Sequence, residues 1–299
     1  MKKQGEGMQD PISPTTWTAE EVGKMLRPRP VDAHKGTMGH ALLVAGSKGM
    51  AGAAILASQA CLRSGIGKLT LHTPEANRVI LQCAVPEAIL HTDSHEGIIT
   101  EHLDTKSYQA VGIGPGIGTS PDTALALRHY LQGCTSPLVL DADALNLIAQ
   151  DPALEALIPY YSILTPHVGE FHRLTHPCES AQERLQTALT YAQSHQVYVV
   201  LKGHPSIVCT PMGDAIACPY GNSGMATPGS GDVLTGIITG LLAQGYPDFV
   251  AAILGTWLHA LAGDCAAEEL GEEAMLASDI VKHLHQAYKK LKAHTVQVL

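Results

Sequence analysis

The sequence predicts an α/β fold in which a mostly parallel central sheet is covered by helices on both faces. Apolar runs of strand length alternate with helical runs, as where residues 40–46 are followed by residues 52–63. The strand runs are apolar throughout, which is typical of parallel strands that are buried on both faces. Hydrophobic residues make up 45% of the 299 residues, enough for the large core of such a fold.

Further strands are expected along the chain, and helical stretches follow several of them. Their ranges are 68–72, 110–113, 138–141, 161–164 and 197–201. Two more strand-like pieces, residues 206–210 and 215–219, flank a Pro-Met-Gly-Asp turn and predict an antiparallel hairpin. Ser278 and Asp279 predict the start of the last helix, with a capping hydroxyl and an acid in its first turn.

No linker, repeat or sharp change of composition divides the chain. We therefore expect a single domain over residues 35–299, preceded by an N-terminal arm over residues 1–34 in which Pro11 and Pro14 favour a loose, irregular backbone. No apolar stretch follows the N-terminal lysines, so the sequence does not predict a secretory signal. We therefore expect a cytoplasmic location.

The most apolar tract, residues 233–263, is interrupted by polar and turn residues. These are Gln244, Gly245, Pro247 and Asp248. The tract is therefore predicted to form two buried helices and no membrane span.

The charged residues and the cysteines exclude two classes of protein. Lys and Arg number 19 against 28 Asp and Glu, for a net charge of −9, and no basic run is long enough to follow a nucleic-acid backbone. A nucleic-acid partner is therefore not expected. The seven cysteines are scattered without a C-x-x-C pair, so we expect reduced thiols and no disulfide framework.

The most informative segment is a glycine-rich loop that begins at Asn222 and runs into an apolar helical stretch. The amides of Gly229, Ser230 and Gly231 would form an anion hole at the positive end of the helix dipole. Asp232, held ionised by that dipole, would accept the proton of a substrate hydroxyl that attacks phosphorus. A plain helix cap with glycines for tight packing is the alternative.

The helix after this loop and the missing motifs narrow the type of site. Gly236-x-x-x-Gly240 predicts that this helix packs closely against a neighbour. The chain contains no G-x-x-x-x-G-K-[S/T] string, which excludes a Walker A loop. A second glycine cluster, residues 111–118, does not match G-x-G-x-x-G and predicts either close approach of a substrate or a tight turn.

Polar groups also follow the apolar strands at the sheet edge where α/β folds bind their ligands. The site candidates there are Asp141, Asp143, Asn146, His167 and Glu170. Asp143 and Asn146 are equally well explained as helix caps.

The spacing of the histidines disfavours a zinc site. His167, His172 and His176 lie close in sequence to Cys178, but their spacing is not that of H-E-x-x-H and no second cluster pairs with them. Any metal held by the protein alone stays unknown at this point. Mg²⁺ carried in on nucleotide phosphates is the expected cofactor.

Several of these motifs occur together in one order. They are His34-Lys-Gly36, Gly52-Ala53-Ala54, Gly114-Pro-Gly116, Asp141 to Asn146, Thr165-Pro-His167, Leu201-Lys-Gly203 and Asn222 to Gly236. This set resembles the ADP/ATP-dependent NAD(P)H-hydrate dehydratases, from about Lys35 to the final helix. The resemblance implies a ribokinase-like three-layer sandwich.

The resemblance also implies a reaction. ADP or ATP would phosphorylate the ring hydroxyl of the S epimer of NADHX or NADPHX, and loss of phosphate would restore NADH or NADPH, a carbon–oxygen lyase reaction of metabolite repair. The residues implied at the hydrated dinucleotide are Ala53, Gly116, His167 and Asp232. Those implied at the nucleotide are Lys202, Gly203, His204, Pro205, Ser206 and Gly231.

Two departures from the family pattern concern the loops. Pro228 stands where a small residue is expected, and it stiffens the anion loop while withdrawing one N–H donor. His204-Pro205 follows Lys202-Gly203 where smaller residues are usual.

The resemblance further suggests a homotetramer and a functional pairing with a separate epimerase, since the 34 residues before Lys35 are too few for the epimerase domain that many family members have. Two alternatives remain. A small-molecule kinase of the same fold, of the hydroxyethylthiazole or hydroxymethylpyrimidine type, would use the same anion loop. A nucleotide-sensing binding protein would need no base, which Asp232 argues against.

Overall fold

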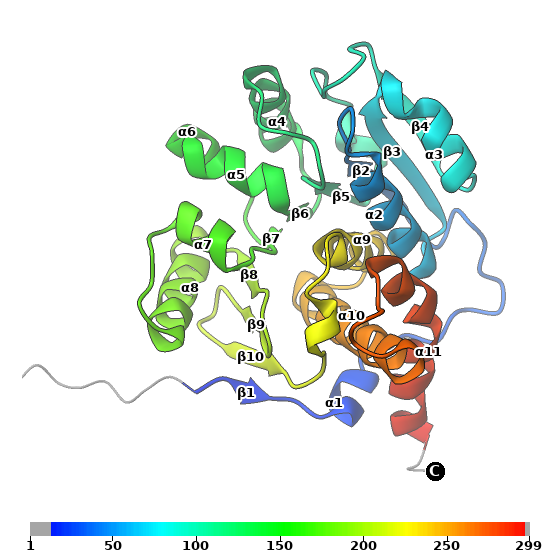
Figure 1. Ribbon diagram of the computed structural model, residues 1–299, viewed down its shortest axis with the longest axis vertical. Helices are drawn as coiled ribbons and strands as arrows, with labels where there is room; N and C mark the ends of the chain where they lie inside the picture. The colour runs from blue at the N-terminus through cyan, green and yellow to red at the C-terminus, as the bar shows by residue number, and fades with distance from the viewer. Residues whose placement is uncertain (1–12, 297–299) are drawn as a thin grey trace, which may run out of the picture.

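The computed structural model describes residues 13–296, which form one ten-stranded sheet with helices on both faces (Figure 1). The strand order is β1-β10-β9-β8-β7-β6-β5-β2-β3-β4. The strands are parallel from β4 across to β8, and β9 is antiparallel to both of its neighbours. The predicted α/β class with a mostly parallel sheet is confirmed.

The strands are short and mostly apolar. Their bounds are Thr15–Thr16 (β1), His40–Val44 (β2), Lys68–Pro74 (β3), Ile89–Asp93 (β4), Ala110–Ile113 (β5), Leu138–Leu140 (β6), Ile163–Leu164 (β7), Tyr198–Leu201 (β8), Ser206–Cys209 (β9) and Ala215–Cys218 (β10). The predicted hairpin is β9 and β10, whose turn is closed by the Thr210 N–H donating to the Asp214 carbonyl at 2.9 Å. The sequence did not predict the edge strands β1 and β4.

The helices form a layer on each side of the sheet. Their bounds are Ala19–Gly23 (α1), Ala51–Arg63 (α2), Arg78–Ala84 (α3), Pro121–Gly133 (α4), Ala142–Gln150 (α5), Pro152–Glu155 (α6), Val168–Leu174 (α7), Ala181–His195 (α8), Ser230–Ala243 (α9), Asp248–Leu270 (α10) and Ala277–Val296 (α11). Short 3-10 turns lie at Glu75–Asn77, Thr105–Ser107 and Ser223–Met225. One buried cluster lies between the sheet and α2, α9, α10 and α11, and the other between the sheet and α4 to α8.

The last helix begins two residues earlier than the sequence predicted. It starts at Ala277, so Ser278 lies within the first turn and is not its cap. The Asp279 carboxylate instead accepts the Leu276 N–H at 3.0 Å. The predicted acid in the first turn is Asp279. It accepts the N–H of the residue just before the helix, and Ser278 does not act as the cap.

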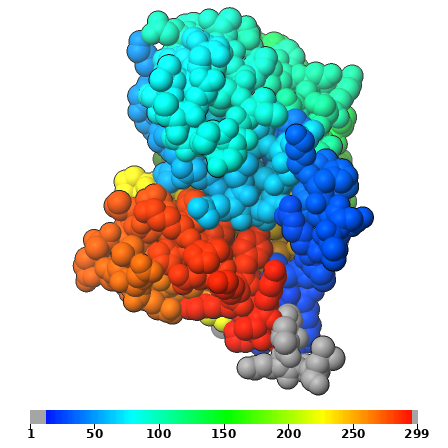
Figure 2. Space-filling view, turned by 90° about the vertical axis from the view of Figure 1, so that its right-hand side faces the viewer, coloured from blue at the N-terminus to red at the C-terminus, as the bar shows by residue number. Residues whose placement is uncertain are grey.

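Part of the predicted N-terminal arm is integrated into the domain. Strand β1 pairs in parallel with β10, Trp17 packs edge-on against Phe249, and Val22 of α1 is fully buried. Figure 2 shows this blue segment lying against the molecule beside the red C-terminal helix. Pro11 and the rest of residues 1–12 lie outside the described residues.

The apolar tract divides as predicted, with α9 ending at Ala243 and α10 beginning at Asp248. By length and composition alone α10 could cross a membrane, but 78% of its most apolar window is buried inside the protein. The apolar surface of α10 is therefore already used by the core.

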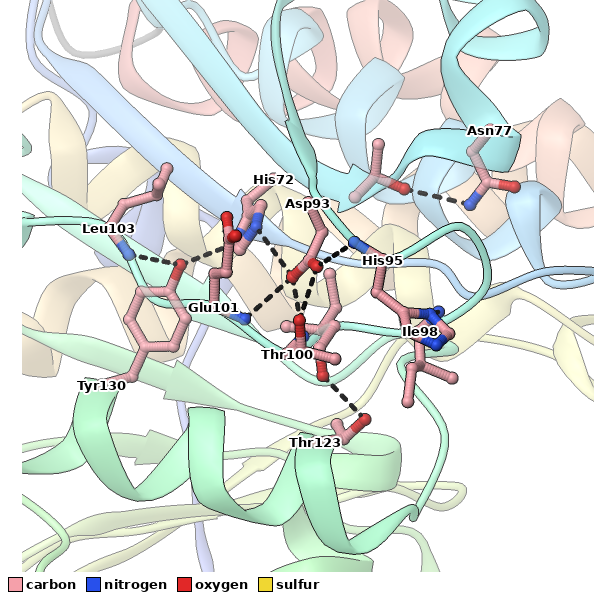
Figure 3. A network of polar contacts seen from close by, with 12 residues as sticks. His72, Asn77, Asp93, His95, Ile98, Thr100, Glu101, Leu103, Thr123 and Tyr130 are labelled. Carbon is pink, nitrogen blue, oxygen red and sulfur yellow. Dashed lines mark hydrogen bonds and ion pairs between the residues drawn. The ribbon is translucent and has the colours of Figure 1, made fainter.

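A buried polar network holds the loop after β4 (Figure 3). The Tyr130 hydroxyl accepts the Leu103 N–H at 3.0 Å and lies 2.7 Å from Nδ1 of His72, to which it donates. Burial lowers the pKa of His72 to about 4, so its ring is neutral.

The Asp93 carboxylate accepts the Thr100 hydroxyl and the N–H groups of His95, Thr100 and Glu101. The loop held in this way contacts the turn before α2, where Lys48 N–H donates to the Gly97 carbonyl.

Close packing of α9 against α2 depends on two glycines. A Cβ on Gly236 would lie 2.1 Å from the Ala57 carbonyl oxygen, and one on Gly240 would lie 2.0 Å from Oγ of Ser64. The helix contact predicted from Gly236-x-x-x-Gly240 is confirmed. It places the start of α9 over the middle of the sheet.

We expect Gly236→Ala to lower the free energy of unfolding by about 2 kcal/mol, because overpacking outweighs the gain in helix propensity. Urea denaturation measures it. Gly133→Ala in α4 is the matched control, since a Cβ there meets nothing within 4 Å. Equal stability of both variants would show that α2 and α9 can move apart freely.

Candidate functional site

A cavity of about 560 Å³ opens where the central strands end and α9 begins. Asp141 follows β6, His167 follows β7, and Lys202 follows β8, so the parallel strands deliver all three to one edge of the sheet. Helix α10 closes the cavity with His259 and Ala260. The sequence predicted this location.

A partly buried ion pair lines the cavity. Nζ of Lys202 lies 2.5 Å from Oδ1 of Asp141, which is 1% exposed. The other oxygen, Oδ2, accepts the hydroxyl of Thr235 in α9 at 2.7 Å. Because both carboxylate oxygens are satisfied, the Lys202 ammonium has a defined position beside the first turn of α9 and is suited to bind a phosphate.

The start of α9 differs in one respect from the predicted anion hole. Gly229 has φ of 92°, the left-handed region that favours glycine, and turns the loop into the helix. The Ser230 N–H donates to the Thr227 carbonyl at 3.3 Å, so this predicted anion-hole amide already has a partner within the protein. The amides of Gly231 and Asp232 belong to the first helical turn, whose N–H groups have no partner within the helix.

His259 anchors this turn from α10. Its Nε2 lies 2.9 Å from the Ser230 carbonyl oxygen and 3.2 Å from Oγ of the same residue. Burial lowers the pKa of His259 to about 4, so the ring is neutral and Nε2–H donates to the carbonyl. The sequence analysis missed His259, although a histidine within an apolar helix was a signal that could have revealed it.

Asp232 lines the cavity and has a strongly altered acidity. Burial, and next the Asp141 carboxylate, raise its pKa to about 7, while Lys202 opposes them. Burial and the neighbouring carboxylates therefore oppose the effect expected of the helix dipole. A carboxylate with a pKa near neutrality is matched to accepting a proton at physiological pH.

His167 and Glu170 form a capping box at the start of α7. Nδ1 of His167 accepts the Gly169 N–H at 3.0 Å, while the Glu170 carboxylate accepts the His167 N–H at 2.8 Å. Since Nδ1 is an acceptor, Nε2 bears the proton and lies 3.1 Å from Oε1 of Glu170. Both residues line the cavity, as predicted.

Ala53 and Gly116 lie together, but neither lines this cavity. A Cβ on Gly116, whose φ is 63°, would lie 3.0 Å from Cβ of Ala53. They adjoin the site through Gly114, where a Cβ would lie 1.8 Å from the Asp141 carbonyl oxygen. The second glycine cluster thus packs closely against the protein's own backbone, and the predicted approach of a substrate stays a prediction.

The remaining candidates fall into two groups. Lys202, Gly203, His204 and Ser206 line the cavity, while Pro205 and Pro228 do not. Asp143 accepts the Gly118 N–H at 2.8 Å and the Asn146 side-chain amide at 3.3 Å, so these two polar residues hold the second glycine loop beside the cavity.

Other lining residues were not predicted individually. Tyr220, Ser223 and Met225 come from the segment between β10 and α9. Asp264 of α10 holds this segment by accepting the Gly221 N–H at 3.0 Å and the Asn222 side-chain amide at 2.9 Å. Only the three-dimensional contact with α10 identifies these residues.

Comparison with known proteins decides the family. The profile of a family described as NAD(P)H-hydrate dehydratase matches residues 41–286. The chain belongs to the NAD(P)H-hydrate dehydratase family. The ADP-dependent (S)-NAD(P)H-hydrate dehydratase of Bacillus subtilis is 35% identical to it over 278 residues, which cover 92% of this chain and 98% of that protein.

Some members of the NAD(P)H-hydrate dehydratase family are much longer. The bifunctional NAD(P)H-hydrate repair enzyme Nnr of Moorella thermoacetica is 36% identical over 288 residues, covering 92% of this chain but 54% of that protein. The chain thus spans about half the length of the bifunctional relatives that it matches.

Solved structures confirm the ribokinase-like arrangement. An ADP/ATP-dependent NAD(P)H-hydrate dehydratase from B. subtilis, co-crystallized with ATP/Mg²⁺, superposes with a TM-score of 0.81 at 33% identity and covers 94% of this chain and 99% of its own. A ribokinase-like superfamily protein from Enterococcus faecalis reaches 0.79 at 27% identity, covering 93% and 96%. A hydroxyethylthiazole kinase from Pyrococcus horikoshii reaches 0.59 at 15% identity, covering 92% of each chain, and shares the fold alone.

We expect Asp232→Asn to raise the free energy of unfolding at pH 8. The pKa of Asp232 is about 7 in the folded protein and 3.8 in the unfolded chain. Ionisation of Asp232 therefore lowers the free energy of unfolding by its full amount above pH 7, and has no effect below about pH 4. The gain should be on the order of a few kcal/mol at pH 8 and vanish on acidification, measured by urea denaturation across pH.

Asp122→Asn is the matched control, since Asp122 is an exposed acid in the first turn of α4 and should give no such gain. A pH-independent effect of Asp232→Asn would contradict the raised pKa.

We expect Gly231→Ala to displace Lys202, because the added Cβ would lie 2.7 Å from Nζ. The flexible lysine end can move, so the thermal midpoint should change little while nucleotide binding weakens. Calorimetric titration of the single variants and of the double variant with Lys202→Met measures the coupling. Strictly additive losses would show that Gly231 acts without Lys202.

Proposed function

We propose that this chain catalyses the nucleotide-dependent dehydration of the S epimer of NADHX or NADPHX to NADH or NADPH. The observation that carries the proposal is that Lys202, the first turn of α9 and Asp232, with its pKa near 7, share one cavity wall. The activities named for its relatives of similar length support it.

The first step would be phosphoryl transfer. Asp232 would accept the proton of the ring hydroxyl of the substrate. The hydroxyl oxygen would attack the terminal phosphorus of ADP or ATP, and the bond from that phosphorus to the leaving AMP or ADP would break. The amides of Gly231 and Asp232 and the Lys202 ammonium would stabilise the charge on the transferred group. Phosphate would then leave with the carbon–oxygen electron pair, and loss of a ring proton would restore the double bond.

The substrate would extend from this centre in two directions. Lys202, Gly203, His204 and Ser206 follow β8 on the nucleotide side, and we assign Pro205 to the same loop. The hydrated ring would lie toward His167, with Ala53 and Gly116 contacting the part of the dinucleotide that extends beyond the cavity.

Mg²⁺ fits the donors of this cavity. Asp141, Glu170 and Asp232 place carboxylate oxygens, the ligands that this ion prefers, on its wall. Asp141 is engaged by Lys202 and Thr235, and Glu170 by His167, so the nucleotide phosphates would carry most of the ion's ligands and these carboxylates would lie beside it. When bound with the nucleotide, Mg²⁺ supplies positive charge beside the phosphates.

The wider setting is also part of the proposal. The enzyme would act in the cytoplasm as a homotetramer, as the family resemblance suggests. Dehydration of the S epimer leaves the R epimer untouched, so we propose that an epimerase on a separate protein supplies the S form.

The decisive experiment mixes the purified full chain with chemically prepared NADHX, Mg²⁺ and either ADP or ATP, and follows the near-ultraviolet absorbance of NADH. We expect a nucleotide-dependent rise whose rate increases with pH through about 7, because Asp232 must be ionised to accept a proton. Asp232→Asn should bind nucleotide almost unchanged and lose on the order of 1,000-fold in turnover.

Asp122→Asn removes a carboxylate that does not line the cavity, and this variant should retain full turnover. Folded protein that binds nucleotide but forms no NADH would reject the dehydratase function. The small-molecule kinase would then be tested with hydroxyethylthiazole and hydroxymethylpyrimidine as phosphoryl acceptors, and binding without turnover of any of these would indicate a nucleotide sensor.

A further inference from the structure

A second group of chemically reactive side chains lies where α7 connects to α8. His176 and Cys178 belong to this connection, and Glu183 lies in the first turn of α8. One ligand atom from each, a nitrogen, a sulfur and a carboxylate oxygen, lies within 4.8 Å of the other two. None of the three lines the catalytic cavity.

The spacing of these atoms suits a shared ion better than a direct bond. Nε2 of His176 and Oε1 of Glu183 are 3.7 Å apart, longer than an ordinary hydrogen bond. Two ligands that each lie about 2.1 Å from one tetrahedral zinc ion are roughly 3.4 Å apart. A shift of a few tenths of an ångström would bring the pair to that geometry, and a movement of the Cys178 side chain would complete it.

Neighbouring groups hold the Glu183 carboxylate and the backbone of the connection. The Glu179 N–H donates to Oε2 of Glu183 at 2.6 Å, which leaves Oε1 directed to His176. The Cys178 N–H donates to Nε2 of His172 at 3.4 Å, which ties the connection to α7. Such outer contacts orient ligands and support metal affinity.

We propose that His176, Cys178 and Glu183 bind a single divalent transition-metal ion, of the Zn²⁺ or Co²⁺ class, with water in the fourth position. A thiolate and an imidazole select such an ion over Mg²⁺, which prefers oxygen ligands. Binding deprotonates the Cys178 thiol and releases that proton to solvent. The ion joins the α7–α8 connection to α8.

The sequence analysis disfavoured zinc because it sought the ligands among neighbouring histidines. His167 lies in the cavity, where it caps α7, and does not join His172 and His176. The third ligand, Glu183, lies five residues beyond Cys178, in α8. Only the fold brings it to His176.

The test is a Co²⁺ titration of chelator-treated full chain under reducing conditions. We expect one equivalent to bind and to produce thiolate-to-cobalt charge-transfer absorption together with the visible bands of a tetrahedral ion. Zn²⁺ should displace the Co²⁺, and a large excess of Mg²⁺ should not. Cys178→Ser should abolish the charge-transfer band and weaken Co²⁺ binding on the order of 100-fold.

Cys83→Ser is the matched control, since Cys83 is an exposed thiol on α3 and its loss should change nothing. Glu183→Gln keeps an oxygen for the Glu179 N–H and should weaken Co²⁺ binding on the order of 10-fold while the thiolate band persists. A charge-transfer band that survives in Cys178→Ser, or Co²⁺ affinity unchanged in both Cys178→Ser and Glu183→Gln, would overturn the proposal.

Discussion

The carboxylate of Asp141 is the interaction on which the site depends. It receives the Lys202 ammonium from the end of β8 and the Thr235 hydroxyl from α9, so one buried group joins two strands and a helix that are far apart in sequence. Removing Lys202 would leave the buried Asp141 carboxylate without its counter-charge, which destabilises the fold. The two residues therefore depend on each other.

The same pair sets the electrostatics of the cavity. Burial is the main cause of the raised pKa of Asp232, the Asp141 carboxylate raises it further and Lys202 lowers it, so the position of the ammonium also affects this acidity. A phosphate that attracts Lys202 would alter this balance as it binds. The narrow space at Gly231 has the same origin, since a side chain there would occupy the position that Asp141 gives to the ammonium.

The sequence predicted the features that depend on local pattern. Fully apolar runs identified the buried strands. The glycine spacing identified the loop before α9, together with Asp232 and Gly236 inside that helix. The pairing of β1 with β10 was not predictable, because two residues contain no periodicity. His259 was missed because its partner, the Ser230 carbonyl, lies 29 residues away and a backbone acceptor leaves no trace in sequence.

Helix α7 shows why such distant contacts matter for function. Its first turn is capped by His167 and Glu170 in the catalytic cavity, and its last residue, Leu174, is buried only two positions before His176. A helix of seven residues with Phe171 and Leu174 in the core has little freedom to tilt. The packing of one short helix therefore fixes both the position of His167 in the cavity and the point at which the connection to α8 begins.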